Sequence, residues 1–272
     1  MPITSALTLP RCTEGEMREL DYAVMAHAFA VQRDLGRLCD EKIYQADLAA
    51  RLTSANLSPI RREAPVTVSF RDFSKTYELD LVVADRAIYE LKTVGALTSA
   101  HEAQLLNYLL LTNSTRGKLI NFRPNSVEAR FVNTTLDHAE RHRLSVHTDG
   151  WQGDDAFFTL VLDLLNDWGT ALETSLYREA LTHFLGGEER VLLQIPMQRE
   201  GMALGNQRFH LASADTAFFV TSFTAEICTK HEVHLRRLLA TSPLKQAYWV
   251  NIGRHDIHFR TLKMAGRFGA GK

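Results

Sequence analysis

Three charged residues interrupt two apolar stretches of the sequence. Asp80 lies within LDLVV (79–83), and Glu90 and Lys92 lie within AIYELK (87–92). Side chains alternate between the two faces of a strand, so Glu90 and Lys92, two residues apart, project from the same face. Burying an unpaired carboxylate or ammonium is costly, so such groups are expected to be paired or to hold a metal. An aspartate on one strand with Glu-x-Lys on the next suits a hard divalent cation, and the lysine can orient or activate an attacking water.

The same three residues also allow a purely structural interpretation. Lys92 can neutralise one of the carboxylates in an internal salt bridge, and charged residues do occur on edge strands. The spacing by itself therefore leaves a metal site and an ion pair as alternatives.

The elements around this stretch follow the order of a mixed α/β sheet domain. Apolar periodicity and turn signals predict helix, helix, three strands, helix and two strands, at about 17–35, 40–52, 64–70, 79–83, 87–92, 98–111, 118–122 and 129–132. Gly36 is the expected stop of the first helix. Ser99 and Glu102 have the spacing of a capping box at the start of the third.

A polar, turn-rich stretch divides the chain into two predicted domains. Residues 137–155 predict a linker between a first domain over 1–136 and a second over 156–272. Its histidines, His138 and His147 among them, lack neighbouring ligands at metal-binding spacing, so a solvated connector is expected.

The second half of the sequence repeats the first. Residues 101–131 align without gaps on 231–261, and 35–52 resemble 168–185. The shared order and near-constant offset predict a tandem duplication, two copies of one α/β unit.

The two copies differ at the charged positions. At the ungapped offset, Asp80, Glu90, Lys92 and Gln104 fall on His210, Val220, Ser222 and His234. The fold therefore does not need those charges, and the second copy is expected to be a structural or binding domain.

Composition sets the class of protein without setting its substrate. The chain is 45% hydrophobic, enough to bury a core, and its net charge of -1 carries no global basic signature for nucleic acid. The three cysteines form no metal or disulfide pattern, so we expect reduced thiols and a cytoplasmic protein. We expect no membrane span and no signal peptide, because no apolar run is long enough and the first residues lack a charged start.

The runs LGRLCDEKIYQADLA, LDLVVADRAIYELKTVGALTSAHEAQLLNYL and KLINF resemble the bacterial GxxExxY proteins of the PD-(D/E)XK nuclease superfamily. The resemblance covers roughly residues 20–133. Leu38 stands where the family has the first glycine of its motif, whereas Glu41 and Tyr44 are present. The second half is similar to a degenerate copy that lacks the signature.

The resemblance implies a restriction-endonuclease-like fold, a mixed central sheet flanked by helices, and gives roles to six side chains. Asp80, Glu90 and Lys92 take the catalytic positions. Glu41 matches an acidic residue that completes the metal shell. Gln104 and Tyr108 match the QxxxY motif of RecB-like nucleases.

The sequence therefore predicts a nuclease that depends on Mg²⁺ or Mn²⁺, with DNA as the expected substrate and RNA as the alternative, and with one active and one degenerate domain. The metal would be held by Asp80, Glu90 and Glu41, with Lys92 positioning or deprotonating a water. A non-catalytic nucleic-acid-binding or scaffold subunit of a larger bacterial assembly is the alternative, and a phosphodiesterase for small molecules is a third. The complete triad favours catalysis. A homo-oligomer or a protein partner is possible.

Overall fold

The computed structural model describes residues 3–5, 7, 9–10 and 12–264. The chain divides into two compact units, 1–138 and 139–272, and each holds one six-stranded mixed sheet. None of the helices in the described residues is both long and apolar enough to cross a membrane.

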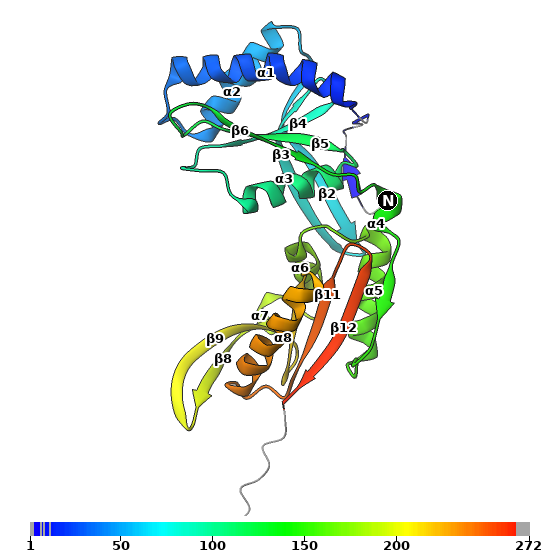
Figure 1. Ribbon diagram of the computed structural model, residues 1–272. Helices are drawn as coiled ribbons and strands as arrows, with labels where there is room; N and C mark the ends of the chain where they lie inside the picture. The colour runs from blue at the N-terminus through cyan, green and yellow to red at the C-terminus, as the bar shows by residue number, and fades with distance from the viewer. Residues whose placement is uncertain (1–2, 6, 8, 11, 265–272) are drawn as a thin grey trace, which may run out of the picture. The chain divides into compact units, whose positions relative to one another are not determined.

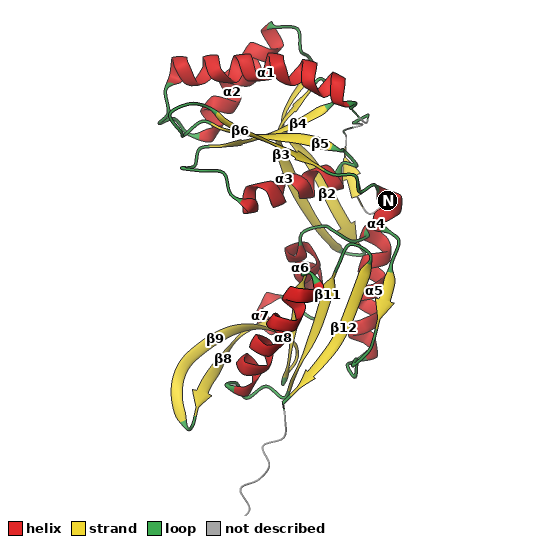
Figure 2. Ribbon diagram, in the orientation of Figure 1, coloured by secondary structure: helices red, strands yellow, loops and turns green. Residues whose placement is uncertain are grey.

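The first unit has helices on both faces of its sheet (Figures 1 and 2). Its elements are β1 (Ile3–Ser5), α1 (Glu14–Leu35), α2 (Glu41–Ser54), β2 (Ile60–Phe70), β3 (Phe73–Val83), β4 (Ala87–Lys92), α3 (Ser99–Leu111), β5 (Arg116–Asn121) and β6 (Glu128–Asn133). The strand order is β1-β2-β3-β4-β5-β6, with β4 and β5 parallel and the other pairs antiparallel. The predicted order is confirmed from α1 to β6, with β2 and β3 longer than expected, whereas β1 was not predicted.

Residue alternation assigns the core and the charged groups of β3 and β4 to opposite faces. Leu81 and Val83 of β3, with Tyr89 and Leu91 of β4, pack into the apolar core formed with α1 and α2. The residues that alternate with these four along each strand therefore project from the other face, which α3 covers. Asp80, Glu90 and Lys92 are among these intervening residues.

The helix ends follow the predicted signals with one correction. Gly36 ends α1 with φ 73°, a left-handed conformation that glycine adopts without strain. The capping box of α3 is formed by Thr98 and His101, and the Thr98 N–H donates to His101 Nδ1 at 3.0 Å. The expected Ser99–Glu102 pair is wrong because the cap lies one residue earlier, and Glu102 instead pairs with Arg130 of β6.

The second unit also holds helices and one mixed sheet. Its elements are α4 (His138–Arg141), which begins at the boundary, β7 (Ser145–His147), α5 (Asp155–Trp168), α6 (Thr174–Phe184), α7 (Glu188–Val191), β8 (Leu192–Arg199), β9 (Met202–Ser213), β10 (Thr216–Thr221), α8 (Ala225–Ala240), β11 (Gln246–Ile252) and β12 (Asp256–Lys263). The strand order is β7-β12-β11-β10-β9-β8.

The expected linker contains ordered elements of this unit. Within 137–155, β7 pairs in parallel with β12. Arg141 is buried, and its Nε donates to the Thr170 carbonyl at 2.8 Å. The polar composition of this stretch thus reflects hydrogen-bonded side chains as well as solvated ones.

The two sheets share a five-strand arrangement. β8 to β12 repeat the order and the directions of β2 to β6, including the single parallel pair, β10–β11. Tyr44 donates its hydroxyl to the Gly36 carbonyl at 2.9 Å, and Tyr177 does the same to Gly169 at 2.6 Å. Both glycines end the first long helix of their unit with positive φ.

The strand registers correct the ungapped alignment by one residue. Asn121 lies opposite Lys92, and Asn251, which ties down the next loop in the same way, lies opposite Thr221. The places of Lys92 and Glu90 are therefore taken by Thr221 and Phe219. The expected Ser222 and Val220 are wrong because a shift of one residue moves a side chain to the opposite face of a sheet.

Replacing Gly117 of β5 is expected to separate α3 from the sheet. A Cβ at this position would lie 3.0 Å from both the Ile88 carbonyl oxygen and Leu105 Cδ1, and 3.2 Å from Leu109. We predict that Gly117→Ala lowers the free energy of unfolding by about 1–3 kcal/mol, measured by urea unfolding. Gly95→Ala is the matched control because no atom lies within 4 Å of its Cβ. Equal stabilities of the two variants would contradict close packing of α3 on β5.

Candidate active site

The site lies where β3 and β4 stop pairing. The antiparallel register ends at Leu81 opposite Tyr89, and one further step places Asp80 opposite Glu90. Asp80 Oδ2 accepts a hydrogen bond from the Leu91 N–H at 2.8 Å. The aspartate side chain thus satisfies a backbone donor of β4 and is held at the side of Glu90.

Glu90 is the most deeply buried charged residue of this site. The residue is 1% exposed, and its Oε1 accepts a hydrogen bond from Lys92 Nζ at 2.6 Å. Its other oxygen, Oε2, is buried and has no hydrogen-bond partner among the described residues. Unpaired buried carboxylate oxygens are unfavourable, so this atom is expected to hold a proton or to bind a cation.

Burial and mutual repulsion raise the pKa values of the acids of this site. Burial, together with the charge of Asp80, raises the pKa of Glu90 to about 8. Burial also raises the pKa of Asp80 and of Glu41, and each effect is opposed in part by Lys92. These shifts are typical of carboxylates crowded together in a place of low polarity.

Lys92 is held in its charged form. Burial by itself would lower the pKa of Lys92, but the surrounding carboxylates, Glu90 foremost, outweigh burial and raise it. An ammonium with a raised pKa holds its proton at neutral pH. Lys92 is therefore better suited to attract a negative group or orient a water than to remove a proton.

Gln45 links α2 to the site, and the sequence did not single it out. This buried residue donates from Nε2 to the Asp80 carbonyl at 2.7 Å, and its Oε1 accepts from Arg62 at 3.0 Å. Glu41 lies one helical turn before Gln45, so the two share a face of α2. The i, i+4 spacing from Glu41 was the signal available in the sequence.

Asn121 fixes the chain directly after Lys92. Its side chain donates to the Val94 carbonyl at 2.8 Å and accepts from the Val94 N–H at 3.1 Å. Because Asn121 also lies opposite Lys92 in the parallel β4–β5 pair, the end of β4 is held on two sides. The repetition of this asparagine at 251 was the sequence signal for this role.

Gln104 and Tyr108 form a pair on α3. Gln104 Nε2 donates to the Tyr108 hydroxyl at 2.9 Å, and the Tyr108 ring packs edge-on against Tyr77 of β3 with centroids 6.1 Å apart. Both residues lie on the helix that covers the face of the sheet carrying Glu90. The hydrogen bond of this pair is internal to α3, and the role of the pair in the site stays a prediction.

The donors present suit a hard divalent cation held by two carboxylates. Across the described ranges, no group of three or more His, Cys, Asp or Glu side chains is arranged to hold a metal ion. Asp80 and Glu90 lie opposite each other, and the role of Glu41 as a third ligand stays a prediction. Mg²⁺ commonly uses one or two protein carboxylates and completes its shell with water and phosphate oxygens. The unpaired Glu90 Oε2 beside Asp80 fits that mode of binding.

The departure from the family motif at Leu38 does not affect the core. Leu38 is 84% exposed, whereas Tyr44 is fully buried and stacks on Phe122 with ring centroids 4.6 Å apart. Tyr44, the buried tyrosine of the GxxExxY pattern, is therefore retained.

A model of the PD-(D/E)XK nuclease superfamily matches residues 18–132, from α1 to β6. This match suggests nuclease activity with nucleic acid as the substrate class, and nucleases of this superfamily typically use divalent metals. A comparison with curated proteins found no match. The crystal structure of SSO0001 is 21% identical over 46% of this chain and 61% of that chain, with a TM-score of 0.28. The chain thus spans less than two thirds of that protein, and the TM-score does not indicate a shared fold.

With divalent ions removed by EDTA, the protein should lose stability as the pH rises from 5 to 8. Because the pKa of Glu90 is raised from 4.5 to about 8, the folded state keeps a proton that the unfolded chain has released in this range. The free energy of unfolding then falls with pH, by up to about 1.4 kcal/mol per unit for one group.

Urea unfolding at several pH values checks this expectation. Glu90→Gln cannot release the proton and should flatten the slope, whereas Glu19→Gln on the exposed side of α1 should follow the wild type. The same slope for wild type and Glu90→Gln would show that Glu90 is ionised in the folded protein.

Proposed function

We propose that the first unit is a divalent-metal-dependent nuclease that hydrolyses phosphodiesters of DNA, with RNA as the alternative substrate. The observation that carries this proposal is the buried Glu90, with one oxygen bound by Lys92 and the other unpaired beside Asp80. The superfamily match over 18–132 supports the same reaction class. The closer likeness to GxxExxY proteins depends on Glu41 and Tyr44.

Asp80 and Glu90 are the proposed metal ligands. A bound Mg²⁺ or Mn²⁺ would supply Lewis-acid stabilisation of the phosphate and a more acidic water. The three carboxylates around a single ammonium leave an excess of negative charge that favours a divalent cation. Lys92, held charged by Glu90, would orient the water and offset the negative charge that develops on the phosphate.

Glu41, Gln104 and Tyr108 are proposed to act around this centre. Glu41 contributes charge from the start of α2 and can hold a metal-bound water. Gln104 and Tyr108, already hydrogen-bonded to each other, would present polar atoms to the lysine, the water or a phosphate. These roles predict smaller effects on the rate than those of the triad.

The second unit is proposed to be a degenerate copy without a catalytic site. Phe219 takes the place of Glu90, and it packs edge-on against Phe209 of the neighbouring strand, with ring centroids 6.4 Å apart. An aromatic pair therefore fills the space that a carboxylate pair occupies in the first unit. Such a pair can stabilise the core but cannot bind a hard cation.

A tandem duplication accounts for these correspondences. The shared strand order and the paired glycines and tyrosines support two copies of one α/β unit, with domains near 1–136 and 156–272. With a single site, the protein would cut one strand at a time unless it pairs with another copy or a partner.

Substitution of the triad should abolish cleavage. We predict that Asp80→Asn, Glu90→Gln and Lys92→Ala each lower the cleavage rate by about 100-fold or more, because each removes a charge at the reacting phosphate. Gel assays with single- and double-stranded DNA and RNA, with Mg²⁺, Mn²⁺ or EDTA, measure this.

The matched controls for these variants lie on the same elements. Glu78→Gln is exposed on β3 beside Asp80, and Glu19→Gln is exposed on α1; both should cleave like the wild type. If the wild type cleaves nothing under any condition, a binding or scaffold role is the better account. If Glu90→Gln cleaves as well as the wild type, the site is elsewhere.

Binding of Mn²⁺ tests the metal ligands apart from catalysis. We expect calorimetry to detect one Mn²⁺ site per chain that Glu90→Gln weakens at least about tenfold, since a carboxylate oxygen ligand is lost. Its affinity should rise from pH 6 to pH 8, because the ion must displace the proton that Glu90 holds. Affinity independent of both pH and Glu90 would place the ion on other residues.

A further inference from the structure

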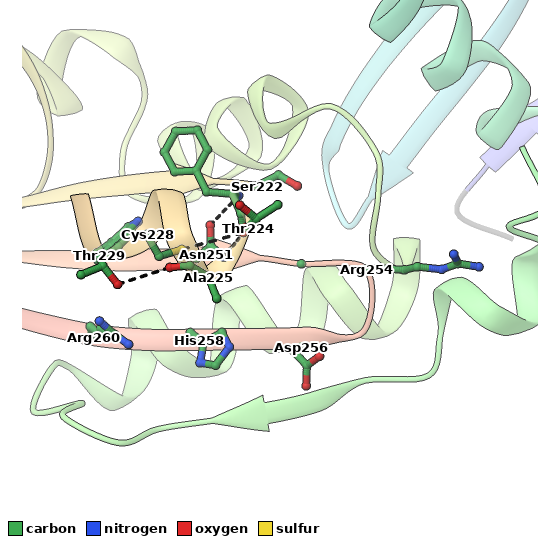
Figure 3. A pocket seen from close by; sticks show the side chains of 13 residues that line it. Ser222, Thr224, Ala225, Cys228, Thr229, Asn251, Arg254, Asp256, His258 and Arg260 are labelled. Carbon is green, nitrogen blue, oxygen red and sulfur yellow. Dashed lines mark hydrogen bonds between the residues drawn. The ribbon is translucent and has the colours of Figure 1, made fainter. Parts of the chain in front are cut away.

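A pocket of about 500 Å³ lies in the second unit, at the ends of β10 and β11 and the start of α8 (Figure 3). Side chains of β11 and β12 form one wall, and the first turn of α8 with the preceding loop forms another. The polar side chains that matter for a ligand are Ser222, Thr224, Asn251, His258 and Arg260. A space of this size is typical of a site for a small molecule.

The loop that leads into α8 beside the pocket is shorter than the loop that leads into α3 in the first unit. Three residues, 222–224, join β10 to α8, whereas six, 93–98, join β4 to α3 in the first unit. In the first unit this longer loop places Leu97 in the core, and the Leu97 N–H donates to Glu128 at 3.2 Å. The second unit keeps the surrounding strands but leaves out the segment that would fill the space.

The residue opposite the loop-binding asparagine also differs in charge between the two units. Glu128 lies opposite Asn121, and the residue opposite Asn251 in the second unit is His258. A carboxylate is thereby replaced by an imidazole, which stacks on His147 with ring centroids 4.5 Å apart. The one acid of the lining, Asp256, is hydrogen-bonded to His147 at 2.9 Å.

Arg260 brings a guanidinium to the pocket, and an ion pair with Glu232 balances part of its charge. Its Nη1 donates to Glu232 at 2.6 Å, which orients a guanidinium that carries five N–H donors. Arg254 also lines the pocket, and the N-terminal end of the 16-residue α8 adds a weaker positive field. Phe223, Trp249 and Ala225 provide apolar surface beside these groups.

We propose that this pocket binds a phosphorylated ligand of nucleotide size, either a free nucleoside monophosphate or the phosphorylated end of a strand. Arg260 and His258 would bind the phosphate, and the base would lie against Phe223 and Ala225. All of these residues belong to the second unit, so the proposal does not depend on cleavage by the first.

Calorimetry with the full chain in EDTA tests this site. The probes are adenosine monophosphate, adenosine, and a single-stranded DNA dodecamer with either a 5′-phosphate or a 5′-hydroxyl. We expect the phosphorylated member of at least one pair to bind at least about tenfold more tightly than its partner, since a charged hydrogen bond is lost without the phosphate. A preference confined to the nucleotide identifies a free ligand, and one confined to the dodecamer identifies a strand end.

Two variants and their controls assign the binding to the pocket. Arg260→Gln should lower the affinity for the phosphorylated probe at least about tenfold. Ala225→Trp should do the same by filling the space without touching the Arg260–Glu232 ion pair. Arg236→Gln removes the other partner of Glu232, and Arg130→Gln removes the equivalent ion pair of the first unit. Both controls should bind normally, with folding checked by circular dichroism.

The proposal is overturned if neither phosphorylated probe is preferred, or if Arg260→Gln and Ala225→Trp bind as the wild type does. It is also overturned if Arg130→Gln weakens binding as much as Arg260→Gln, because the effect would then be one of general charge. The binding is measured in EDTA and assigned by variants of the second unit alone, which separates this result from the outcome of the cleavage assays.

Discussion

The first unit is built around a carboxylate that its fold keeps out of water. Glu90 is 1% exposed at the middle of a sheet, where an unpaired charge would be strongly destabilising. Lys92 satisfies one oxygen, and the neighbouring Asp80 raises the pKa of the group instead of relieving it. A site of this kind is stable when it holds a proton or a cation, and this requirement links its acid–base behaviour to metal binding.

The surrounding elements hold that carboxylate in place. Alternation along β3 and β4 sends Tyr89 and Leu91 into the core with α1 and α2 and leaves the charged side chains on the α3 face. Asn121 holds the chain after Lys92, and Gln45 ties α2 to the backbone of Asp80. The charged cluster is therefore positioned by these contacts to the backbone together with the hydrogen bond from the Leu91 N–H to Asp80.

The second unit has a similar five-strand arrangement with different side chains on its strands. The asparagine, the glycine stop and the buried tyrosine recur, while Phe219 and Phe209 occupy the place of the acids. Removing the buried charges removes the need for a cation. The loop before α8 is shorter, and a pocket that Arg254, His258 and Arg260 help to line lies beside it.

Local pattern was enough to predict much of this protein. Apolar periodicity, Gly36 and the charges within apolar strands predicted the order of elements in the first unit and singled out Asp80, Glu90 and Lys92, because these signals act between neighbours in the chain. Strand register, by contrast, is decided by contacts between distant segments. Only the tertiary structure placed Phe219 in the position of Glu90, moved the cap of α3 to Thr98, drew β7 from the expected linker into a sheet, and left Glu90 Oε2 without a partner. Each of these features depends on contacts between residues that are distant in the sequence. The spacing of residues along a single strand does not specify such contacts.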